Sequence, residues 1–532
     1  MIGRPSWLII PGGFLAFLLL WPLAAVVQQA SVDGIAWLGT PYVRSRVAGA
    51  LAQAFLSLLL ALAVAVPLAW LHHSRRVAGR RWMLALHAAP FVMPVFVVVF
   101  GLQATVGANG WLANLGGPNL LAMPLVAVAL ANATYNAGFA ARLGVEVLDG
   151  RPRALEEAAA TLGAPPRGVW ARVTGPLLAP RLVAVALLVL LFSLGSFGVV
   201  LLLGDGAIDT LETLLYANRA GAFPRPDRAA ALALLQLVLN GLLVALALRL
   251  GKRTRRASQP WTAPPASRTR TAFLGAFAVL STLPLVAVLV GGFRLRGAWS
   301  LAPWRTLLDA QAPGHLSGFS LGSALGWSLG YALLSTLLAL GLTLALAYGL
   351  RPLGRLRRVA EWMAATPLAT SSLTLGYGLV AAFSGGLAVL GAVWIPARSP
   401  LFVVAAHTLL AFPLASRLVV PALDAVDRRL EQAASLLGAS PLRQLFRIHL
   451  PLLGPALLGA ASLAAAASLG DFGASLLLSP GDALGLSVWI ARHGGPGSFD
   501  PLARAQSTAL AGLLMLLTLA VLALAAPRRR TT

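Results

Sequence analysis

Few side chains in this sequence have a type and spacing that could do chemistry. The sharpest is Asp471 in "LGDFG", an acid inside a predicted membrane span, where the equivalent stretch "LGSFG" has Ser196. Asn132, Tyr135 and Asn136 add polar groups to another apolar stretch, where they are expected to line a pathway or to bond between helices. Asp471 is expected either to pair with a neighbouring helix or to lie near an outer gate. The chemistry available is therefore hydrogen bonding and a buried charge.

The sequence shows no motif for covalent, metal or nucleotide chemistry. The sequence contains no cysteine, which excludes disulfides, thiolate metal ligands and cysteine nucleophiles. His407 has no second histidine or carboxylate at ligand spacing, so a packed histidine is the favoured interpretation. A phosphate loop needs G-x-x-x-x-G-K-[ST], but Gly251 and Lys252 are followed by Arg253. We predict that the chain is not an enzyme and binds no metal or cofactor. Any ATP would be hydrolysed by a separate protein.

The overall composition is that of a membrane protein. Hydrophobic residues make up 58% of the sequence and charged residues 11%, against about 45–50% and 25% in soluble proteins. The formal net charge of +24 would suggest nucleic acid in a soluble protein, but Lys and Arg accumulate in the cytoplasmic loops of membrane proteins. We therefore predict an all-α integral membrane protein that contacts lipid and binds no nucleic acid.

Apolar windows of at least about 18 residues indicate helices that can cross the hydrocarbon. A further run, Gly385–Val393, is too short to span and is expected to be re-entrant or interfacial. A signal sequence is the alternative for the first window, but its apolar run is long and no clear cleavage site follows it. The windows number about twelve: Trp7–Val27, Val47–Leu71, Trp82–Gln103, Leu120–Ala140, Leu177–Leu203, Ala229–Leu250, Ala272–Gly292, Ala324–Leu350, Val359–Phe383, Pro400–Ser416, Leu452–Leu478 and Ala505–Ala526.

The positions of Arg and Lys predict the orientation of these helices. Basic residues gather in alternate connections, at 75–81, 142–172, 252–270, 351–358 and 417–447, and again at 528–530. The connection at 104–119 carries no charge, and the one at 384–399 carries only Arg398. By the positive-inside rule, both termini of the chain are predicted to be cytoplasmic, which agrees with an even number of spans.

The two halves of the chain repeat each other. A shift of 275 positions pairs many identical residues without a gap. Six helices per half, joined by a cytoplasmic connection, predict parallel repeats. The predicted domains are 1–250, a basic and Pro/Ser-rich linker at 251–271, and 272–532. Identical pairs include Leu155–Glu156 with Leu430–Glu431, Gly163–Ala164 with Gly438–Ala439, Pro176 with Pro451, and Gly195, Phe197 and Gly198 with Gly470, Phe472 and Gly473.

A polar stretch at 156–170, "EEAAATLGAPPRGVW", has a near copy at 431–446, "EQAASLLGASPLRQLF". In the first copy Leu155, Ala158, Ala159 and Leu162 share one helical face, and Gly163 is placed to end the helix. Prolines follow, so a short helix, a sharp turn and a second short helix are predicted on the cytoplasmic side. An ordinary interfacial connection is the alternative. Two matched copies on one face favour docking of a partner with two-fold symmetry.

At these residues the chain resembles a known family. Glu-x-Ala-Ala, then three residues, Gly and a distant Pro, is similar to the EAA loop of permease subunits from bacterial binding-protein-dependent ABC importers. Two such loops in one chain resemble fused permeases with the type I importer fold. The first copy departs from the pattern, with "VTG" before Pro176 where the second has "IHL" before Pro451, so somewhat asymmetric docking is expected. The resemblance implies that the ATP-hydrolysing subunit contacts Glu156, Ala158, Ala159 and Gly163, and Glu431, Ala433, Ala434 and Gly438.

The same resemblance implies a function in import. Residues 204–236, with Thr-x-Glu, Tyr216 and "AAALALLQ", are similar to the thiamine importer permeases, so the expected substrate is thiamine or its phosphates. Two copies of an ATP-binding subunit would bind ATP and Mg, and a periplasmic binding protein would dock on loops 204–228 and 479–504 of this bacterial inner-membrane protein. A ferric-iron importer permease is the near alternative. A secondary transporter without an ATPase more often carries charges within several helices.

Overall fold

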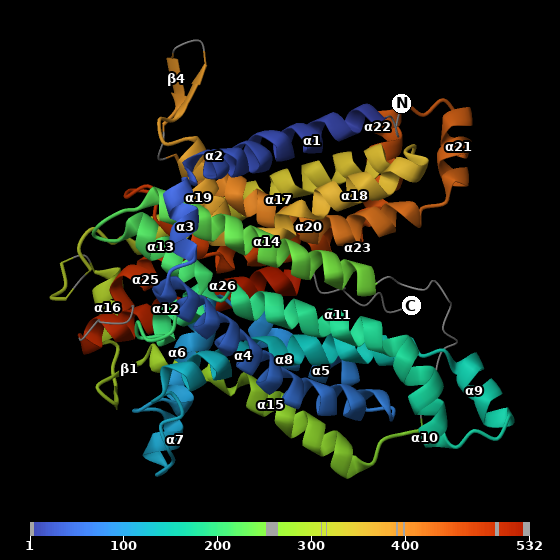
Figure 1. The fold of residues 1–532 in the computed structure, drawn as a ribbon, viewed down its shortest axis with the longest axis horizontal. Coiled ribbons are helices and arrows are strands. Elements are labelled where there is room, and N and C mark those ends of the chain that lie inside the picture. Colours follow the sequence, from blue (N-terminus) through green and yellow to red (C-terminus); the bar gives the residue numbers. More distant parts are fainter. Residues whose placement is uncertain are drawn as a thin grey trace. The chain divides into compact units, whose positions relative to one another are not determined.

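The computed structural model describes residues 5–251, 264–309, 311–314, 316–389, 392–396, 399–494 and 500–524. Helices dominate these residues, which confirms the predicted all-α class (Figure 1). The chain packs as two compact units. We call Ala36–Ala217 with Leu235–Gly291 the first-half unit, and Met1–Ile35 with Asn218–Leu234 and Gly292–Thr532 the second-half unit.

The first-half unit is built around α4 and α8. Small residues such as Ala61 and Ala65 of α4 and Ala137 and Ala141 of α8 are buried together, which lets the helix backbones approach closely. α3, α13 and α14 contribute residues to both units. Its helices, with those three, are α3 (Val32–Leu38), α4 (Pro41–His73), α5 (Arg80–Val92), α6 (Val95–Val106), α7 (Trp111–Asn114), α8 (Pro124–Asp149), α9 (Arg153–Thr161), α10 (Pro166–Val169), α11 (Gly175–Leu194), α12 (Phe197–Leu203), α13 (Leu211–Ala220), α14 (Pro226–Leu250) and α15 (Arg268–Gly291).

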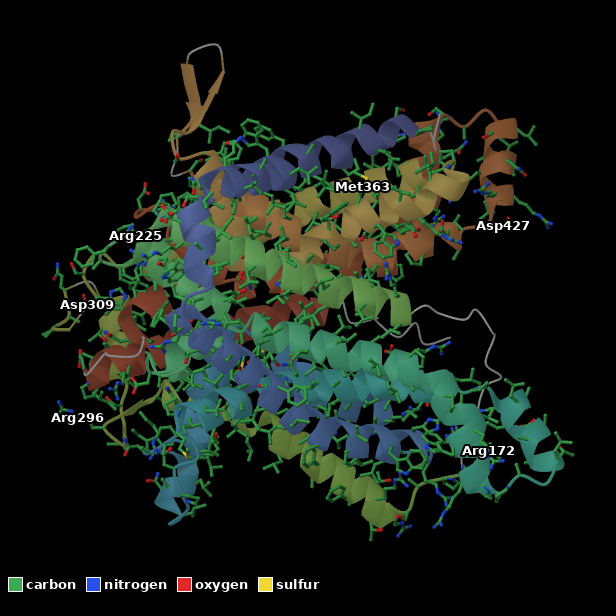
Figure 2. The ribbon with its side chains drawn as sticks, in the orientation of Figure 1. Arg172, Arg225, Arg296, Asp309, Met363 and Asp427 are labelled. Carbon is green, nitrogen blue, oxygen red and sulfur yellow. The ribbon has the colours of Figure 1, made fainter. Side chains whose placement is uncertain are left out.

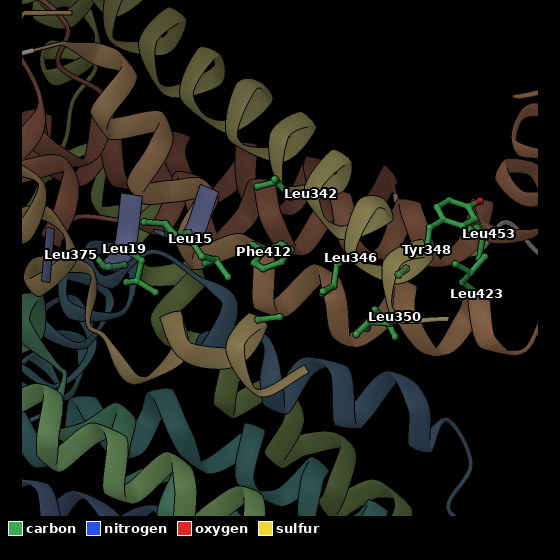
Figure 3. Close-up of a cluster of buried hydrophobic side chains, with 14 residues drawn as sticks. Leu15, Leu19, Leu342, Leu346, Tyr348, Leu350, Leu375, Phe412, Leu423 and Leu453 are labelled. Carbon is green, nitrogen blue, oxygen red and sulfur yellow. The ribbon is translucent and has the colours of Figure 1, made fainter. Parts of the chain in front are cut away.

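The second-half unit packs α17, α20 and α23 against the N-terminal helix of the chain. Figure 3 shows Leu15 and Leu19 of that helix in one apolar cluster with Leu346 and Phe412. The elements are α1 (Ile9–Leu15), α2 (Trp21–Gln29), β1 (Arg294–Leu295), β2 (Ala298–Trp299), α16 (Ala302–Leu308), α17 (Leu321–Leu350), α18 (Arg357–Ala365), α19 (Ser372–Ala382), β3 (Leu387–Val389), β4 (Ala392–Ile395), α20 (Pro400–Asp424), α21 (Arg428–Leu436), α22 (Pro441–Gln444), α23 (Leu450–Gly470), α24 (Gly473–Leu478), α25 (Leu486–Gly494) and α26 (Pro501–Leu524).

The compact units exchange one helix relative to the predicted repeats. α1 and α2 come from the first repeat but pack in the second-half unit, whereas α15 comes from the second repeat and packs against α5 and α6 in the first-half unit. The division into 1–250, 251–271 and 272–532 therefore describes the sequence repeat, and not the compact units. Most of the predicted linker, at 252–263, lies outside the described residues.

Ten helices among the described residues are long and apolar enough to cross a membrane, where the sequence predicted about twelve. α8 is not one of the ten, because Asn132, Tyr135 and Asn136 lower its hydropathy. The window Val359–Phe383 is not one helix either. It breaks between α18 and α19 at a 3-10 turn that contains Pro367, which cannot donate a helical hydrogen bond.

The short apolar run Gly385–Val393 contributes to a β-hairpin. β3 and β4 pair antiparallel, with Leu387 opposite Ile395 and Val389 opposite Ala392, and residues 390 and 391 lie outside the described residues. Figure 1 shows the hairpin projecting from the helices of its own unit. β-branched residues favour this extended form, and a re-entrant or interfacial position of the hairpin stays a prediction.

Candidate functional site

The two polar loops have the same backbone. We call residues 152–174 the first loop and residues 427–449 the second loop. In the first, Gly163 has φ +83° and the N–H groups of Gly163 and Ala164 bond back to Ala160 and Ala159. In the second, Gly438 has φ +75°, and it and the following residue make the equivalent bonds. Each short helix thus ends in a Schellman motif, which needs glycine at the left-handed position.

The short helices α9 and α21 lie at the surface of the chain. None of their residues is buried. Figure 2 places Asp427, the residue before α21, and Arg172, just after α10, where each loop lies at the end of its own unit. Leu162 and the equivalent Leu437 are 88% and 87% exposed. The same turn exposes a leucine side chain to solvent in both loops. Such a repeated exposed apolar group indicates a surface that another protein covers.

The remaining loop residues of the predicted docking set lie on these same short helices. Ala158 and Ala433 are exposed, and Ala159 and Ala434 are half-buried at equivalent positions. Gly163 and Gly438 are exposed, and a Cβ added to either would meet nothing within 4 Å. The predicted helix, turn and short helix are therefore present in both copies, although the contact with a partner stays a prediction.

Glu156 and Glu431 bond within the chain. Glu156 accepts a hydrogen bond of 2.7 Å from the Thr174 hydroxyl, and Arg151 lies 3.9 Å away. Glu431 lies 3.0 Å from His449 Nε2 and 2.5 Å from an Arg351 nitrogen. Each glutamate thus bonds to the residue just before its long helix, α11 or α23. The sequence shows different residues before Pro176 and Pro451, but it did not reveal that Thr174 and His449, at equivalent positions, are the partners of the two glutamates.

The bonding in the second loop is more extensive than in the first. The Tyr348 hydroxyl lies 2.7 Å from His449 Nδ1, and Arg351 also donates to the Leu423 carbonyl at 2.9 Å. The side chains of Arg351 and His449 are only 10% and 0% exposed. A charged network holds the second glutamate, whereas the nearest partner of Glu156 is a neutral hydroxyl.

An aspartate just ahead of each loop bonds to the connection before it. Asp149 contacts His73 Nδ1 and Arg80, both at 2.7 Å. Partial burial acts to raise the pKa of Asp149, but the hydrogen bonds from His73 and Arg80 outweigh it and hold that pKa below the ordinary carboxyl value. In the second half the Arg357 guanidinium bonds both oxygens of Asp424, which raises the pKa of Arg357. Both loops are therefore anchored at their base.

Asn132 and Asn136 belong to a buried polar cluster in the first-half unit. Asn132 Nδ2 lies 3.2 Å from Gln53 Oε1 and 3.1 Å from Ser196 Oγ, and Asn136 donates to the Asn132 carbonyl. Tyr135 is separate from this cluster, because its hydroxyl donates to the carbonyl of Met93. The sequence analysis did not single out Gln53 of α4, which belongs to this cluster through its contact with Asn132. These contacts fit the bonding interpretation for the two asparagines.

Asp471 lies in the equivalent cluster of the second-half unit. Its carboxylate accepts a bond from the Ser475 N–H at 3.1 Å and lies 3.2 Å from His407 Nε2. The shift of 275 positions relates His407 to Asn132 and Asp471 to Ser196. The expectation that Asp471 pairs with a neighbouring helix is met through His407 of α20. Within the described part of the chain, no group of three His, Asp or Glu residues is arranged to hold a metal ion.

Comparison with known proteins gives two matched stretches. The family described as "Binding-protein-dependent transport system inner membrane component" matches residues 36–256 and 337–530. The chain is 30% identical over 545 residues to the thiamine transport system permease protein ThiP of Escherichia coli (strain K12), covering 96% of this chain and 95% of that protein. It is 29% identical over 453 residues to ThiP of Brucella abortus (strain 2308), covering 81% of this chain and 78% of that protein. Over 252 residues it is 36% identical to ThiP of Salmonella typhimurium, covering 45% and 47%.

Proposed function

The chain belongs to the family of binding-protein-dependent transport system inner membrane components, and from this premise we propose that it is the fused permease subunit of an ATP-driven thiamine importer. The family assignment confirms the predicted resemblance, and the apolar helices agree with a multi-pass inner-membrane protein. The likeness to ThiP over nearly the whole length of both chains supports thiamine or its phosphates as substrate.

The observation that carries the proposal is the duplicated exposed loop. α9 and α21 present the same helix, the same left-handed glycine and the same exposed leucine. Two identical ATP-binding subunits would each need one such surface, because a symmetric partner repeats its contacts. Those subunits would bind the ATP and Mg that drive transport, and the leucines would supply apolar contact to them.

Glu156 and Glu431 would transmit the motion of the ATPase into the membrane helices. Each carboxylate bonds to the residue that precedes a long helix, α11 in one half and α23 in the other. A shift of the short helix therefore pulls on the base of the long one. Coupling of this kind is a difference in free energy between two arrangements of the helices.

The remaining parts of the proposal follow from the predicted orientation. Both termini are cytoplasmic, and the loops at 204–228 and 479–504 face the periplasm, where a substrate-loaded binding protein docks. ATP binding opens the helices outward to receive thiamine, and hydrolysis returns them to the inward state. α13 and α25 are the helices of these two loops.

The experiment is uptake of radiolabelled thiamine into proteoliposomes that contain the chain, the ATPase and the binding protein from neighbouring reading frames. Gly163→Val and Gly438→Val each force a β-branched residue into a left-handed backbone, at about 1–3 kcal/mol. We expect ATPase activity to persist while thiamine imported per ATP falls. Gly297→Val is the matched control, because Gly297 has φ +85° and open space but lies in the β1–β2 turn. Uptake of ferric iron in place of thiamine would overturn the substrate, and unchanged coupling in both loop variants would overturn the docking role.

A further inference from the structure

Each half of the chain breaks a long helix at the same place. In the second-half unit α23 ends at Gly470 and α24 begins at Gly473, so Asp471 and Phe472 fall in the gap. In the first-half unit α11 ends at Leu194 and α12 begins at Phe197. A break next to an apolar span leaves backbone groups that need polar partners. Both polar clusters described above surround these breaks.

In the second-half unit the polar groups at the break are a buried aspartate and a buried histidine. The Asp471 side chain is 4% exposed and that of His407 is 2% exposed. Besides the 3.2 Å contact with Asp471, His407 Nδ1 lies 2.7 Å from Ser468 Oγ. A carboxylate removed from water is costly unless it is paired and hydrogen-bonded. The Asp471 carboxylate is therefore held by His407 and by the Ser475 N–H, and His407 is held in turn by Ser468.

A small polar cavity is lined by His407 and by Ser475, two side chains that contact the Asp471 carboxylate. It has room for about one water molecule. Its side chains offer hydroxyl, phenol and imidazole groups, and they come from α17, α20, α23, α24 and α25. They are Ser328, Tyr331, His407, Ser468, Ser475 and Ser487. The cavity is too small for a solute larger than water, so a larger solute can enter it only when these helices separate.

The first half satisfies the equivalent helix break with other side chains. At the positions equivalent to His407 and Asp471 it has Asn132 and Ser196, which bond to each other at 3.1 Å across the same kind of helix break. The buried carboxylate of that unit, Glu212, is held by the Phe197 N–H at 3.1 Å and by Gln236 at 2.8 Å. Each break thus holds a buried carboxylate, and the second differs from the first in that its carboxylate contacts a histidine that lines a polar cavity.

We propose that Asp471 binds the positive charge of the transported organic cation, with His407 holding its place while the site is empty. This inference rests on the proposed thiamine import. Thiamine carries a fixed positive charge on its thiazolium ring and hydrogen-bond donors on its aminopyrimidine, which match a carboxylate surrounded by serine hydroxyls. As α20 and α24 separate, the cation replaces the imidazole against the Asp471 carboxylate, so that the charge is never left unpaired.

The test transplants the first half's residues into the second. His407→Asn with Asp471→Ser installs a pair that the same fold already accommodates, and Asp471→Asn alone removes the charge with nearly constant shape. Proteoliposomes with the complete transporter are given thiamine and an isostere whose thiazolium is replaced by neutral thiophene. We expect the preference for thiamine over the neutral isostere to fall at least tenfold in both variants.

Glu212→Gln is the matched control, because it removes the other buried carboxylate from a site without this cavity. It should lower thermal stability and leave the preference for the charged substrate intact. A preference that survives both Asp471 variants, or that Glu212→Gln abolishes equally, would overturn the inference while thiamine import by the unaltered chain still supports the proposed function. Failure of the unaltered chain to import thiamine would overturn both.

Discussion

Removing Glu431 should loosen its loop far more than removing Glu156 loosens the other. Glu431 bonds to Arg351 and His449, whose side chains are 10% and 0% exposed. Deleting one member of a buried charge network costs about 3–5 kcal/mol, because the remaining charge is left uncompensated. The Glu156 carboxylate accepts a hydrogen bond from the neutral hydroxyl of Thr174, a contact worth about 1.5 kcal/mol because one partner is charged.

Hydrogen–deuterium exchange of the purified chain measures this difference directly. Each 1.4 kcal/mol changes the local opening equilibrium by about tenfold. Glu431→Ala should therefore lower the protection of amides at 428–449 by about a hundredfold or more. Glu156→Ala should lower the protection of amides at 153–174 by only about tenfold.

Neighbouring exposed residues supply matched controls. Glu157→Ala and Gln432→Ala alter equivalent exposed positions on the same two helices, and neither should change protection by more than about twofold, since surface substitutions cost little. Equal losses from Glu156→Ala and Glu431→Ala would show that the charged network adds nothing, and a larger loss in the first loop would refute the reasoning altogether.

Three further outcomes follow from the contacts. Gly138→Ala would place a Cβ 1.7 Å from the His87 carbonyl oxygen and should cost at least about 1–3 kcal/mol, whereas Gly241→Ala meets nothing and should not lower the Tm measured in detergent. Because the pKa of Asp149 is lowered, its bonds stabilise the fold fully above about pH 4 and lose that effect as the pH falls through the lowered pKa. Asp149→Asn should therefore make the Tm depend less on pH in this acid range. Arg357→Lys keeps the charge but loses the two-pronged contact with a half-exposed carboxylate, so a Tm change equivalent to more than about 1 kcal/mol would contradict our view of that pair.

The repeat made much of this architecture accessible from sequence. A shift of 275 positions relates Gly163 to Gly438, and both have the left-handed backbone that ends a helix. The same shift relates Thr174 to His449, so the bond from each loop glutamate could have been predicted by asking what stands eighteen residues later. It was missed because a threonine and a histidine look unrelated until their shared partner is known.

Other features depended on contacts that no local pattern records. The apolar windows could not tell that α1 and α2 pack in the second-half unit, because hydropathy says that a helix is buried in lipid or protein and not which helix it meets. The break in the window Val359–Phe383 is an exception, because Pro367 is a local signal for it that a hydropathy window does not register. The partner of Asp471 was also a matter of tertiary contact, since His407 lies 64 residues earlier.

The N-terminal helix is synthesised well before the second-half helices that it packs against. Leu8 lies so close to Gly349 that an added Cβ there would come within 2.6 Å of the leucine side chain. At a translation rate of roughly 5–20 residues per second, about 340 further residues take roughly 17–70 seconds to appear, and for that time the N-terminal helix waits in the lipid without its protein neighbours. A chain cut between the halves should therefore leave the N-terminal fragment exposed to membrane proteases until the C-terminal fragment arrives.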